Sequence, residues 1–136
     1  IKALSDHATL IDCEVANNTR YGIISMAAKY ISIIRTNSTS NGDYGILWYT
    51  THNSSLTDSR IINNTLSGLS LNGCSNNTIT GNEISRNGHD GNLGVGMEIN
   101  AYYDVLAVNN DISKNIINCF IDKYSPSSYF NWITSF

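Results

Sequence analysis

Short runs of alternating apolar and polar residues recur along the chain. Two examples are Leu69-Ser70-Leu71 and Met97-Glu98-Ile99, in which every second residue is apolar. Successive side chains of a β-strand point to opposite faces, so this period of two predicts strands with one buried face. Gly, Asn and Ser separate the runs, which indicates many short strands joined by bends.

The strands belong to a repeat. Gly22, Gly45 and Gly68 follow one another at intervals of 23 residues, and Gly96 comes 28 residues after Gly68, so we expect a five-residue insertion before Gly96. On this register the apolar columns are Leu10, Ile33, Leu56, Ile79 and Ala107, and Val15, Ser38, Ile61, Ile84 and Ile112. A fixed period of this length is typical of a solenoid, here with about five coils of roughly 23 residues each.

One polar residue type also keeps the register. The same position of every repeat is an asparagine, namely Asn18, Asn41, Asn64, Asn87 and Asn115. Neighbouring coils lie about 4.8 Å apart, so each side-chain amide can donate to the next and accept from the previous one. The sequence therefore predicts a structural asparagine ladder along one corner of the solenoid.

These patterns predict one fold class, an all-β, right-handed, single-stranded parallel β-helix. No single coil can bury its apolar side, whereas stacked coils form parallel sheets around one core. A leucine-rich repeat has a similar period, but it needs several Leu per unit and a helical segment, which Asn, Ser and Thr replace here. We expect coils over residues 1–124 and a cap, or the start of a further coil, over 125–136. The interrupted first coil suggests a fragment of a longer protein.

Composition and charge narrow the range of possible binding partners. Only 14% of residues are charged, whereas the chain holds 19 Asn, 17 Ser and 11 Thr. The formal net charge is −3 and the eight Lys and Arg are dispersed, which argues against a nucleic-acid partner. No stretch approaches the roughly 20 apolar residues of a membrane span. Cys13, Cys74 and Cys119 fall in different coils and columns, so we expect buried free thiols.

Two segments carry a family resemblance. They are Leu56-Thr57-Asp58-Ser59-Arg60-Ile61-Ile62-Asn63-Asn64 with Gly68-Leu69-Ser70-Leu71, and Asn77-Thr78-Ile79-Thr80-Gly81-Asn82-Glu83-Ile84-Ser85-Arg86-Asn87. These units resemble the repeats of pectate-lyase-like β-helix proteins, including the NosD-like group, and the resemblance extends from about Ala8 to Lys123. It implies an extracellular or cell-surface location. That family includes sugar lyases, hydrolases, epimerases, phage tailspikes and non-enzymatic surface proteins, so the resemblance does not select a function.

Outward carboxylates are the first candidate site. Asp58 and Glu83 fall on adjacent coils, and we expect them roughly 8 Å apart, within the window of about 6.5–9.5 Å for an inverting glycosidase. Asp111 is expected in the column of Glu83. In a lyase or epimerase, Arg60 or Arg35 could neutralise the sugar carboxylate. The alternative interpretation is a solvated face with opposite charges paired across strands.

Outward tyrosines are the second candidate site. Tyr21 and Tyr44 are expected to stack on successive coils, with Tyr49 nearby, and aromatic faces suit the C–H face of a pyranose. The alternative is an apolar patch covered by further chain or another subunit. Trp48 falls in an inward column above the small Ser25, so we expect it in the core.

Metal and cofactor chemistry has little support. The insertion Gly88-His89-Asp90-Gly91-Asn92-Leu93 holds a His and an Asp, but zinc or calcium ligand spacing is absent. We expect no metal and no cofactor.

Three functions remain open. The first is a non-catalytic extracellular or surface β-helix segment that contacts carbohydrate or a neighbouring chain. The second is a polysaccharide hydrolase, lyase or epimerase that uses Asp58, Glu83 and Arg60. The third is a segment of a homotrimeric, tailspike-type protein.

Overall fold

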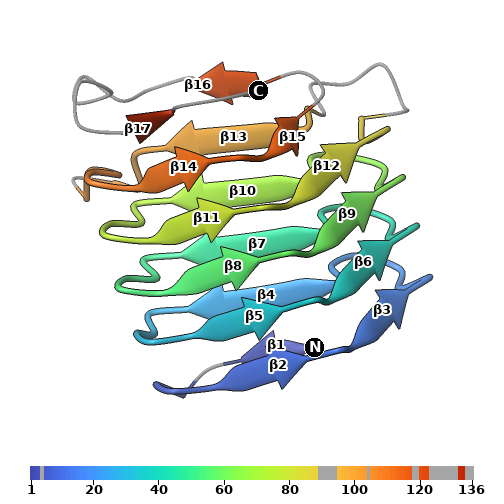
Figure 1. The fold of residues 1–136 in the computed structure, drawn as a ribbon, viewed down its shortest axis with the longest axis horizontal. Helices are drawn as coiled ribbons and strands as arrows, with labels where there is room; N and C mark the ends of the chain where they lie inside the picture. Colours follow the sequence, from blue (N-terminus) through green and yellow to red (C-terminus); the bar gives the residue numbers. More distant parts are fainter. Residues whose placement is uncertain (4, 89–94, 104, 118–119, 123–131, 134–136) are drawn as a thin grey trace.

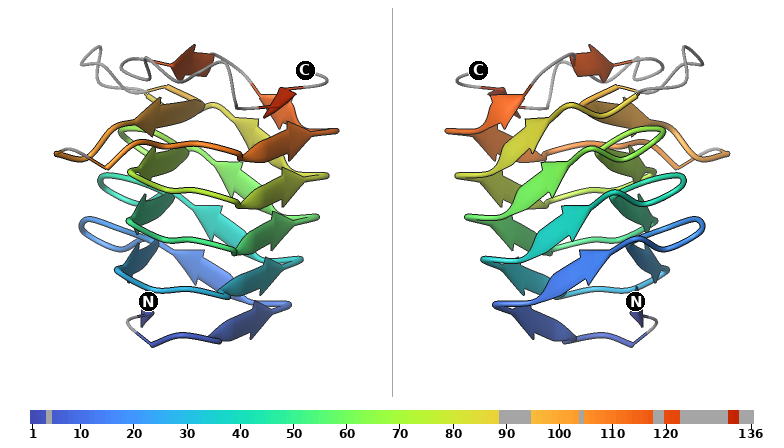
Figure 2. Two further views of the ribbon diagram at one scale, coloured as in Figure 1. Left: turned by 90° about the vertical axis from the view of Figure 1, so that its left-hand side faces the viewer. Right: turned by 90° about the vertical axis from the view of Figure 1, so that its right-hand side faces the viewer.

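The chain winds into a stack of coils in which every strand pairs in parallel with the strand one coil away (Figure 1). The computed structural model describes residues 1–3, 5–88, 95–103, 105–117, 120–122 and 132–133. Three sheets run the length of the stack, and successive coils lie one above another from the N-terminal to the C-terminal end (Figure 2). The predicted fold class, a parallel β-helix, is confirmed.

Sheet A contains the longest strands. Its order is β1 (Lys2–Ala3), β4 (Ile23–Met26), β7 (Ile46–Tyr49), β10 (Leu69–Asn72), β13 (Met97–Asn100) and β16 (Phe120–Asp122). The four glycines of the repeat immediately precede β4, β7, β10 and β13. A side chain at Gly45 would clash, since its Cβ would lie 2.5 Å from Ile61 Cγ2, so the repeat needs glycine there.

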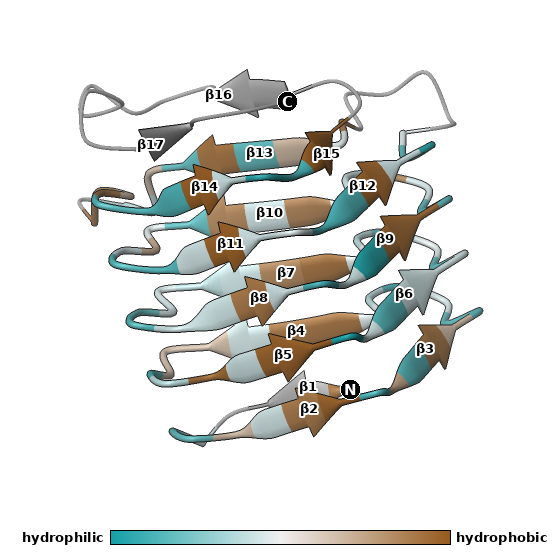
Figure 3. Ribbon diagram, in the orientation of Figure 1, coloured by the Kyte–Doolittle hydropathy of each residue, from teal (hydrophilic) through white to brown (hydrophobic). Residues whose placement is uncertain are grey.

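Sheets B and C complete each coil. Sheet B has the order β17 (Trp132–Ile133), β14 (Asp111–Ser113), β11 (Thr78–Thr80), β8 (Ser55–Thr57), β5 (Ser32–Ile34) and β2 (Thr9–Ile11). Sheet C has the order β15 (Ile116–Ile117), β12 (Glu83–Ser85), β9 (Arg60–Ile62), β6 (Asn37–Thr39) and β3 (Glu14–Ala16). The middle residue of each sheet B strand from β2 to β14 is aliphatic (Figure 3), which places an apolar column against the core.

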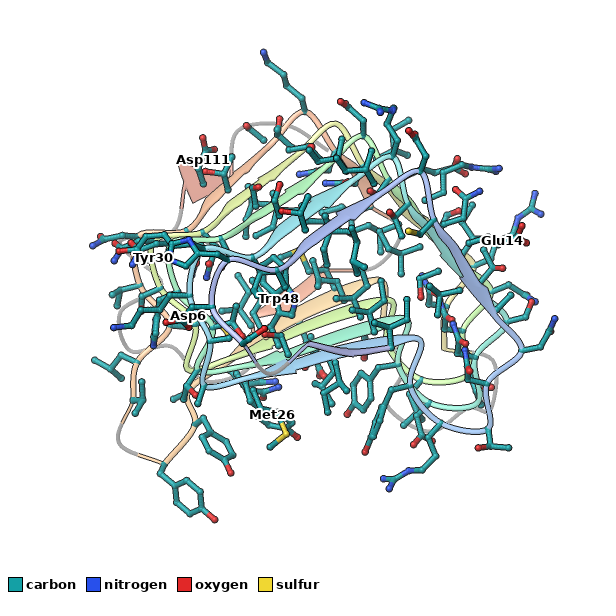
Figure 4. The ribbon with its side chains drawn as sticks, turned by 90° about the horizontal axis from the view of Figure 1, so that it is seen from below. Asp6, Glu14, Met26, Tyr30, Trp48 and Asp111 are labelled. Carbon is teal, nitrogen blue, oxygen red and sulfur yellow. The ribbon has the colours of Figure 1, made fainter. Side chains whose placement is uncertain are left out.

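The core lies between the three sheets. Trp48 is fully buried there, between Ser25 and Leu71 of the neighbouring strands, as predicted. Seen along the axis, Trp48 lies inside the coils, whereas Met26, Glu14 and Asp111 lie outside sheets A, C and B respectively (Figure 4). Cys74 is a buried free thiol and Cys13 is a half-buried one, while Cys119 lies outside the described residues.

Asparagine ladders connect the coils at the corner between sheets C and A. The Nδ2 group donates to Oδ1 of the next coil from Asn18 to Asn41 at 2.8 Å, from Asn41 to Asn64 at 2.9 Å and from Asn64 to Asn87 at 3.0 Å. Asn41 and Asn64 are buried, so these amides would otherwise be unsatisfied in the core.

Asn115 does not belong to this ladder, so its predicted place is wrong. Asn82 Nδ2 donates to Asn115 Oδ1 at 3.0 Å at the corner between sheets B and C. A second insertion, between β13 and β14, makes the spacing 33 residues instead of 28: Ile79 pairs with Ile112. Ala107 and Ile112 therefore do not occupy the predicted columns. Asp111 pairs with Thr78, and Ile116 is the neighbour of Glu83.

The two other corners have ladders of their own. Between sheets A and B, Ser54 N–H donates to Asn77 Oδ1, and Asn77 Nδ2 donates to Asn110 Oδ1. Between sheets B and C, Ser59 N–H donates to Asn82 Oδ1, which precedes the bond to Asn115. In each of these two ladders the lowest of the three members is a serine and the two above it are asparagines. A search for one repeated residue type therefore does not find them.

The C-terminal stretch adds strands to the stack. β16 pairs with β13, and Trp132–Ile133 pairs with Asp111 and Ile112 of β14. The rest of the predicted unit at 125–136 and the insertion at 89–94 lie outside the described residues. No helix able to cross a membrane occurs in the described part of the chain.

Candidate functional site

The outer face of sheet A differs from an ordinary solvated strand surface. Its central outward column runs through Ile24, Leu47, Ser70 and Glu98. Leu47 is only 1% exposed, Ser70 is 0% exposed and Glu98 is 8% exposed. By contrast, the first residue of a sheet C strand also points outward, and it is exposed in Glu14, Arg60 and Ile116. The middle of the outer face of sheet A is therefore covered rather than solvated.

Two tyrosines line one margin of this face. Tyr21 and Tyr44 precede the glycines that begin β4 and β7, and their ring centroids lie 6.0 Å apart with a tilt of 31°. The guanidinium of Arg20 lies 4.6 Å from the centre of the Tyr21 ring, and Arg20 Nε donates to Asp43 Oδ2 at 3.0 Å. These contacts hold the Tyr21 ring on the surface.

Further tyrosines line the opposite margin. Tyr49 ends β7, and its ring lies 5.0 Å from that of Tyr102, which comes from the second insertion. Tyr103 packs edge-on against Tyr102 at 4.6 Å. The predicted residues Tyr21, Tyr44 and Tyr49 thus share one face of the solenoid, at the two ends of the strands that cross it.

The Tyr44 and Tyr49 phenols stay protonated in ordinary buffers. Burial raises the pKa of Tyr44 to about 12, and the nearby charge of Glu98 acts in the same direction. Burial also raises the pKa of Tyr49, with contributions from Tyr21, Tyr102 and Glu98. Each hydroxyl can therefore donate a hydrogen bond to a ligand oxygen.

A short chain of amides continues the Tyr49 margin onto the next two coils, where Asn72 and Asn100 occupy the position of Tyr49. Asn100 Nδ2 donates to Asn72 Oδ1 at 3.1 Å, and Asn72 Nδ2 donates to Ser70 Oγ at 2.8 Å. Five residues of this face were not predicted as site residues from the sequence, namely Ser70, Asn72, Glu98, Asn100 and Tyr102. The signal was present for Glu98, which is the charged member of the alternating run Met97-Glu98-Ile99 in the column of Leu47.

The predicted carboxylate site lies elsewhere, near the corner between sheets B and C. Glu83 Oε2 accepts from Arg60 Nε at 3.0 Å, and this hydrogen bond holds the pKa of Glu83 below its usual value. Asp58 occupies the preceding bend with φ of 51°, and the next coil has Gly81 at that position. Arg35 makes two hydrogen bonds to Asp12 in the same column. This arrangement matches charge pairing across strands.

A shallow hollow marks the corner between sheets A and B. It has a volume of about 400 Å³ and its rim includes Tyr30, Asn53 and Asn76, one residue from each of three coils. Its lining contains no Asp, Glu, Lys, Arg or His, so it offers no acid, base or charged ligand group.

The described histidines are engaged locally. The His7 ring stacks on Tyr30 at 4.8 Å, and His52 Nδ1 accepts from the Ser75 N–H at 3.1 Å. Burial lowers the pKa of His52, and Lys29 contributes to the shift. In the part of the chain that the structure describes, no three His, Cys, Asp or Glu side chains gather where they could hold a metal ion. His89 and Asp90 lie outside that part.

Comparison with known families identifies the repeat. Residues 3–135 match the family model described as "Periplasmic copper-binding protein (NosD)". The chain belongs to the NosD family. The family description names copper, which the described residues do not fit because they provide no cluster of ligand side chains. No curated protein matches this NosD-family chain.

Two solved structures resemble this member of the NosD family. The A-module of the mannuronan C-5 epimerase AlgE6 from Azotobacter vinelandii superposes with a TM-score of 0.68 at 16% identity, over 84% of this chain and 41% of that one. The periplasmic alginate epimerase AlgG superposes with a TM-score of 0.70 at 14% identity, over 97% of this chain and 35% of that one. The chain spans well under half of either neighbour, and identities this low show the shared fold alone.

Proposed function

We propose that this β-helix segment binds a glycan along the outer face of sheet A without catalysing a reaction. The supporting observation is two pairs of tyrosines at opposite ends of these strands, Tyr21 with Tyr44 and Tyr49 with Tyr102, next to a patch of Ser, Asn and Glu side chains on the following coils. Aromatic faces provide apolar contact for sugar C–H groups, while phenols and amides provide directional hydrogen bonds. By their names, one solved neighbour is a mannuronan epimerase and the other an alginate epimerase, which is consistent with a sugar ligand.

An enzymatic role for Asp58, Glu83 and Arg60 is the less favoured alternative. A general acid needs a raised pKa, whereas the hydrogen bond from Arg60 lowers that of Glu83. Arg60 is also engaged by Glu83 and would have to leave it to meet a substrate carboxylate.

We further propose that the protein works outside the cytoplasm, at the cell surface or in the periplasm. The family and AlgG are both described as periplasmic. Contact with a neighbouring chain, including a homotrimer, is the competing use of the tyrosine-lined face.

Glycan retardation in native gels tests the proposal. Gels would contain neutral, amino or uronic polysaccharides, and Tyr44→Ala should weaken retardation about tenfold in the gel that retards the parent protein. Tyr30→Ala is the matched control, because Tyr30 is an exposed tyrosine at a different corner. Equal retardation of the parent and Tyr44→Ala proteins would contradict the proposal.

The same panel separates binding from catalysis. Asp58→Asn and Glu83→Gln should leave retardation unchanged, and the parent protein should form no reducing ends or unsaturated products and, by NMR of the polysaccharide, no C-5 epimers. Product formation that either change abolishes would establish the enzyme instead. If no glycan is bound or turned over, detection of a trimer by light scattering would support the alternative in which this face contacts a neighbouring chain.

A further inference from the structure

Glu98 occupies an unusual place for a carboxylate. It lies in β13 between Met97 and Ile99, which point into the core, so its own side chain points outward over sheet A. Outward residues of strands normally meet solvent, yet more than nine-tenths of Glu98 is covered. Its neighbour on the preceding strand, Ser70, is completely covered.

No described residue satisfies the Glu98 carboxylate. It accepts no hydrogen bond and enters none of the ion pairs found among the described side chains, which join Arg20 to Asp43, Arg35 to Asp12 and Arg60 to Glu83. The nearby polar groups are used by one another, since Asn100 donates to Asn72 and Asn72 donates to Ser70. A largely covered carboxylate that has no donor among the described residues is free to accept a hydrogen bond from a bound cation.

The carboxylate can still be reached from outside. Among the described residues, Trp48 Nε1 is the only fully enclosed side-chain nitrogen or oxygen that lacks a partner. The oxygens of Glu98 are therefore not fully enclosed, and the exposed remainder of the side chain includes its carboxylate. Glu98 is thus a largely covered carboxylate of which a small part still meets solvent.

Aromatic rings accompany this charge. The Glu98 carboxylate acts electrostatically on both Tyr44 and Tyr49, one from each margin of the face. A carboxylate combined with tyrosine π-faces attracts a cation, because both present negative potential. A uronate would bring a second carboxylate against Glu98, which like-charge repulsion disfavours.

We propose that the glycan bound on sheet A carries a free amine, as in a deacetylated hexosamine, and that Glu98 accepts its ammonium group. Tyr44 and Tyr49 supply the flanking π-faces, and Asn72 and Asn100 orient the sugar hydroxyls. This inference rests on the proposed glycan binding and specifies the class of sugar.

Calorimetric titration with three sets of oligosaccharides of equal length tests it. The probes are glucosamine, N-acetylglucosamine and mannuronate oligomers, at a mildly acidic pH where the sugar amine is protonated. The parent chain should bind the glucosamine oligomer about tenfold more tightly than the acetylated one. Glu98→Gln should remove this preference while binding of the acetylated oligomer persists, and thermal melting verifies that the variant folds.

A matched variant controls for unspecific attraction between a polycation and a chain of net charge −3. Glu83→Gln removes the same charge from another face and should keep the preference. Equal effects of Glu83→Gln and Glu98→Gln would overturn the assignment of the site. Equal affinity for the acetylated oligomer, or tighter binding of mannuronate, would overturn the amine while leaving glycan binding intact. Absence of binding by all three would remove both proposals.

Discussion

The outer face of sheet A and the corner between sheets B and C are built from the same coils, yet their outward residues have opposite surroundings. On sheet A, Leu47 and Ser70 point outward and are enclosed. Near the corner, Arg60 and Glu83 also point outward, and their paired side chains remain 59% and 40% exposed. Alternation along a strand therefore determines which residues leave the core, but not whether those residues meet water.

The difference comes from what flanks the strands. Large rings stand at both ends of β7, with Tyr44 before it and Tyr49 at its last position, and Tyr102 reaches in from the second insertion. At the corner between sheets B and C, a two-residue bend such as Asp58-Ser59 separates the strands and supplies no bulky group. A covered face can bind a ligand with little further desolvation, whereas a row of exposed ion pairs contributes mainly solubility.

A charge placed at one outward position of each surface should produce the largest difference in the free energy of unfolding. Leu47→Asp should destabilise the protein by about 4 kcal/mol, because the carboxylate would be enclosed by tyrosine rings without a partner. Thr57→Asp, outward on sheet B, should change the free energy of unfolding by less than about 1 kcal/mol. Urea melts measure both. Similar small losses would show that the outer face of sheet A is not enclosed.

Substitutions in the internal ladders should destabilise the protein to a similar extent at both corners, although the surfaces outside the ladders differ. Asn64→Leu and Asn82→Leu should each destabilise by about 3 kcal/mol, since each leaves buried amide and carbonyl groups unpaired. Asn37→Leu, at an outward position of sheet C, is the control and should cost much less. Unequal losses at Asn64 and Asn82 would mean that one corner contributes more than the other to the stability of the stack.

Alkaline pH should lower the free energy of unfolding through the ionisation of Tyr44 on the enclosed face. The unfolded chain deprotonates Tyr44 near pH 10.0 and the folded chain at about 12, so stability present below pH 10 is lost as pH rises through that interval. Between pH 9 and 11.5 the loss should be smaller in Tyr44→Phe by about 1 kcal/mol, allowing for solvent screening of a half-buried ring. Denaturant melts across this range, with Tyr30→Phe as control, would show parallel losses if Tyr44 were not covered.

Breaking an ion pair should have the smallest effect. Arg60→Ala should cost about 0.2–1 kcal/mol at low salt and less at high salt, because exposed pairs are screened. Glu83 should regain a pKa nearer its ordinary value, which NMR titration of its carboxyl would detect. The contribution of the pair should fade as pH falls and Glu83 becomes protonated. A large loss would show that this corner is as enclosed as sheet A.

Much of the architecture follows from the sequence alone. The 23-residue period, the alternation and the glycine before each long strand are local properties, so they predicted the coils, the inward position of Trp48 and the stacking of Tyr21 on Tyr44. The ladder from Asn18 to Asn87 was equally visible, because one residue type repeats there without interruption.

The tertiary structure decided three other features. The second insertion shifted Asn115 and Asp111 to other columns, since a loop has no periodicity from which its length can be counted. The ladders that begin with Ser54 and Ser59 mix two residue types that are equivalent only because their oxygens meet the same backbone N–H groups. The enclosure of Glu98 does not follow from the alternation in Met97-Glu98-Ile99, which places it outward, because coverage of a strand is a property of the folded stack rather than of any segment of it.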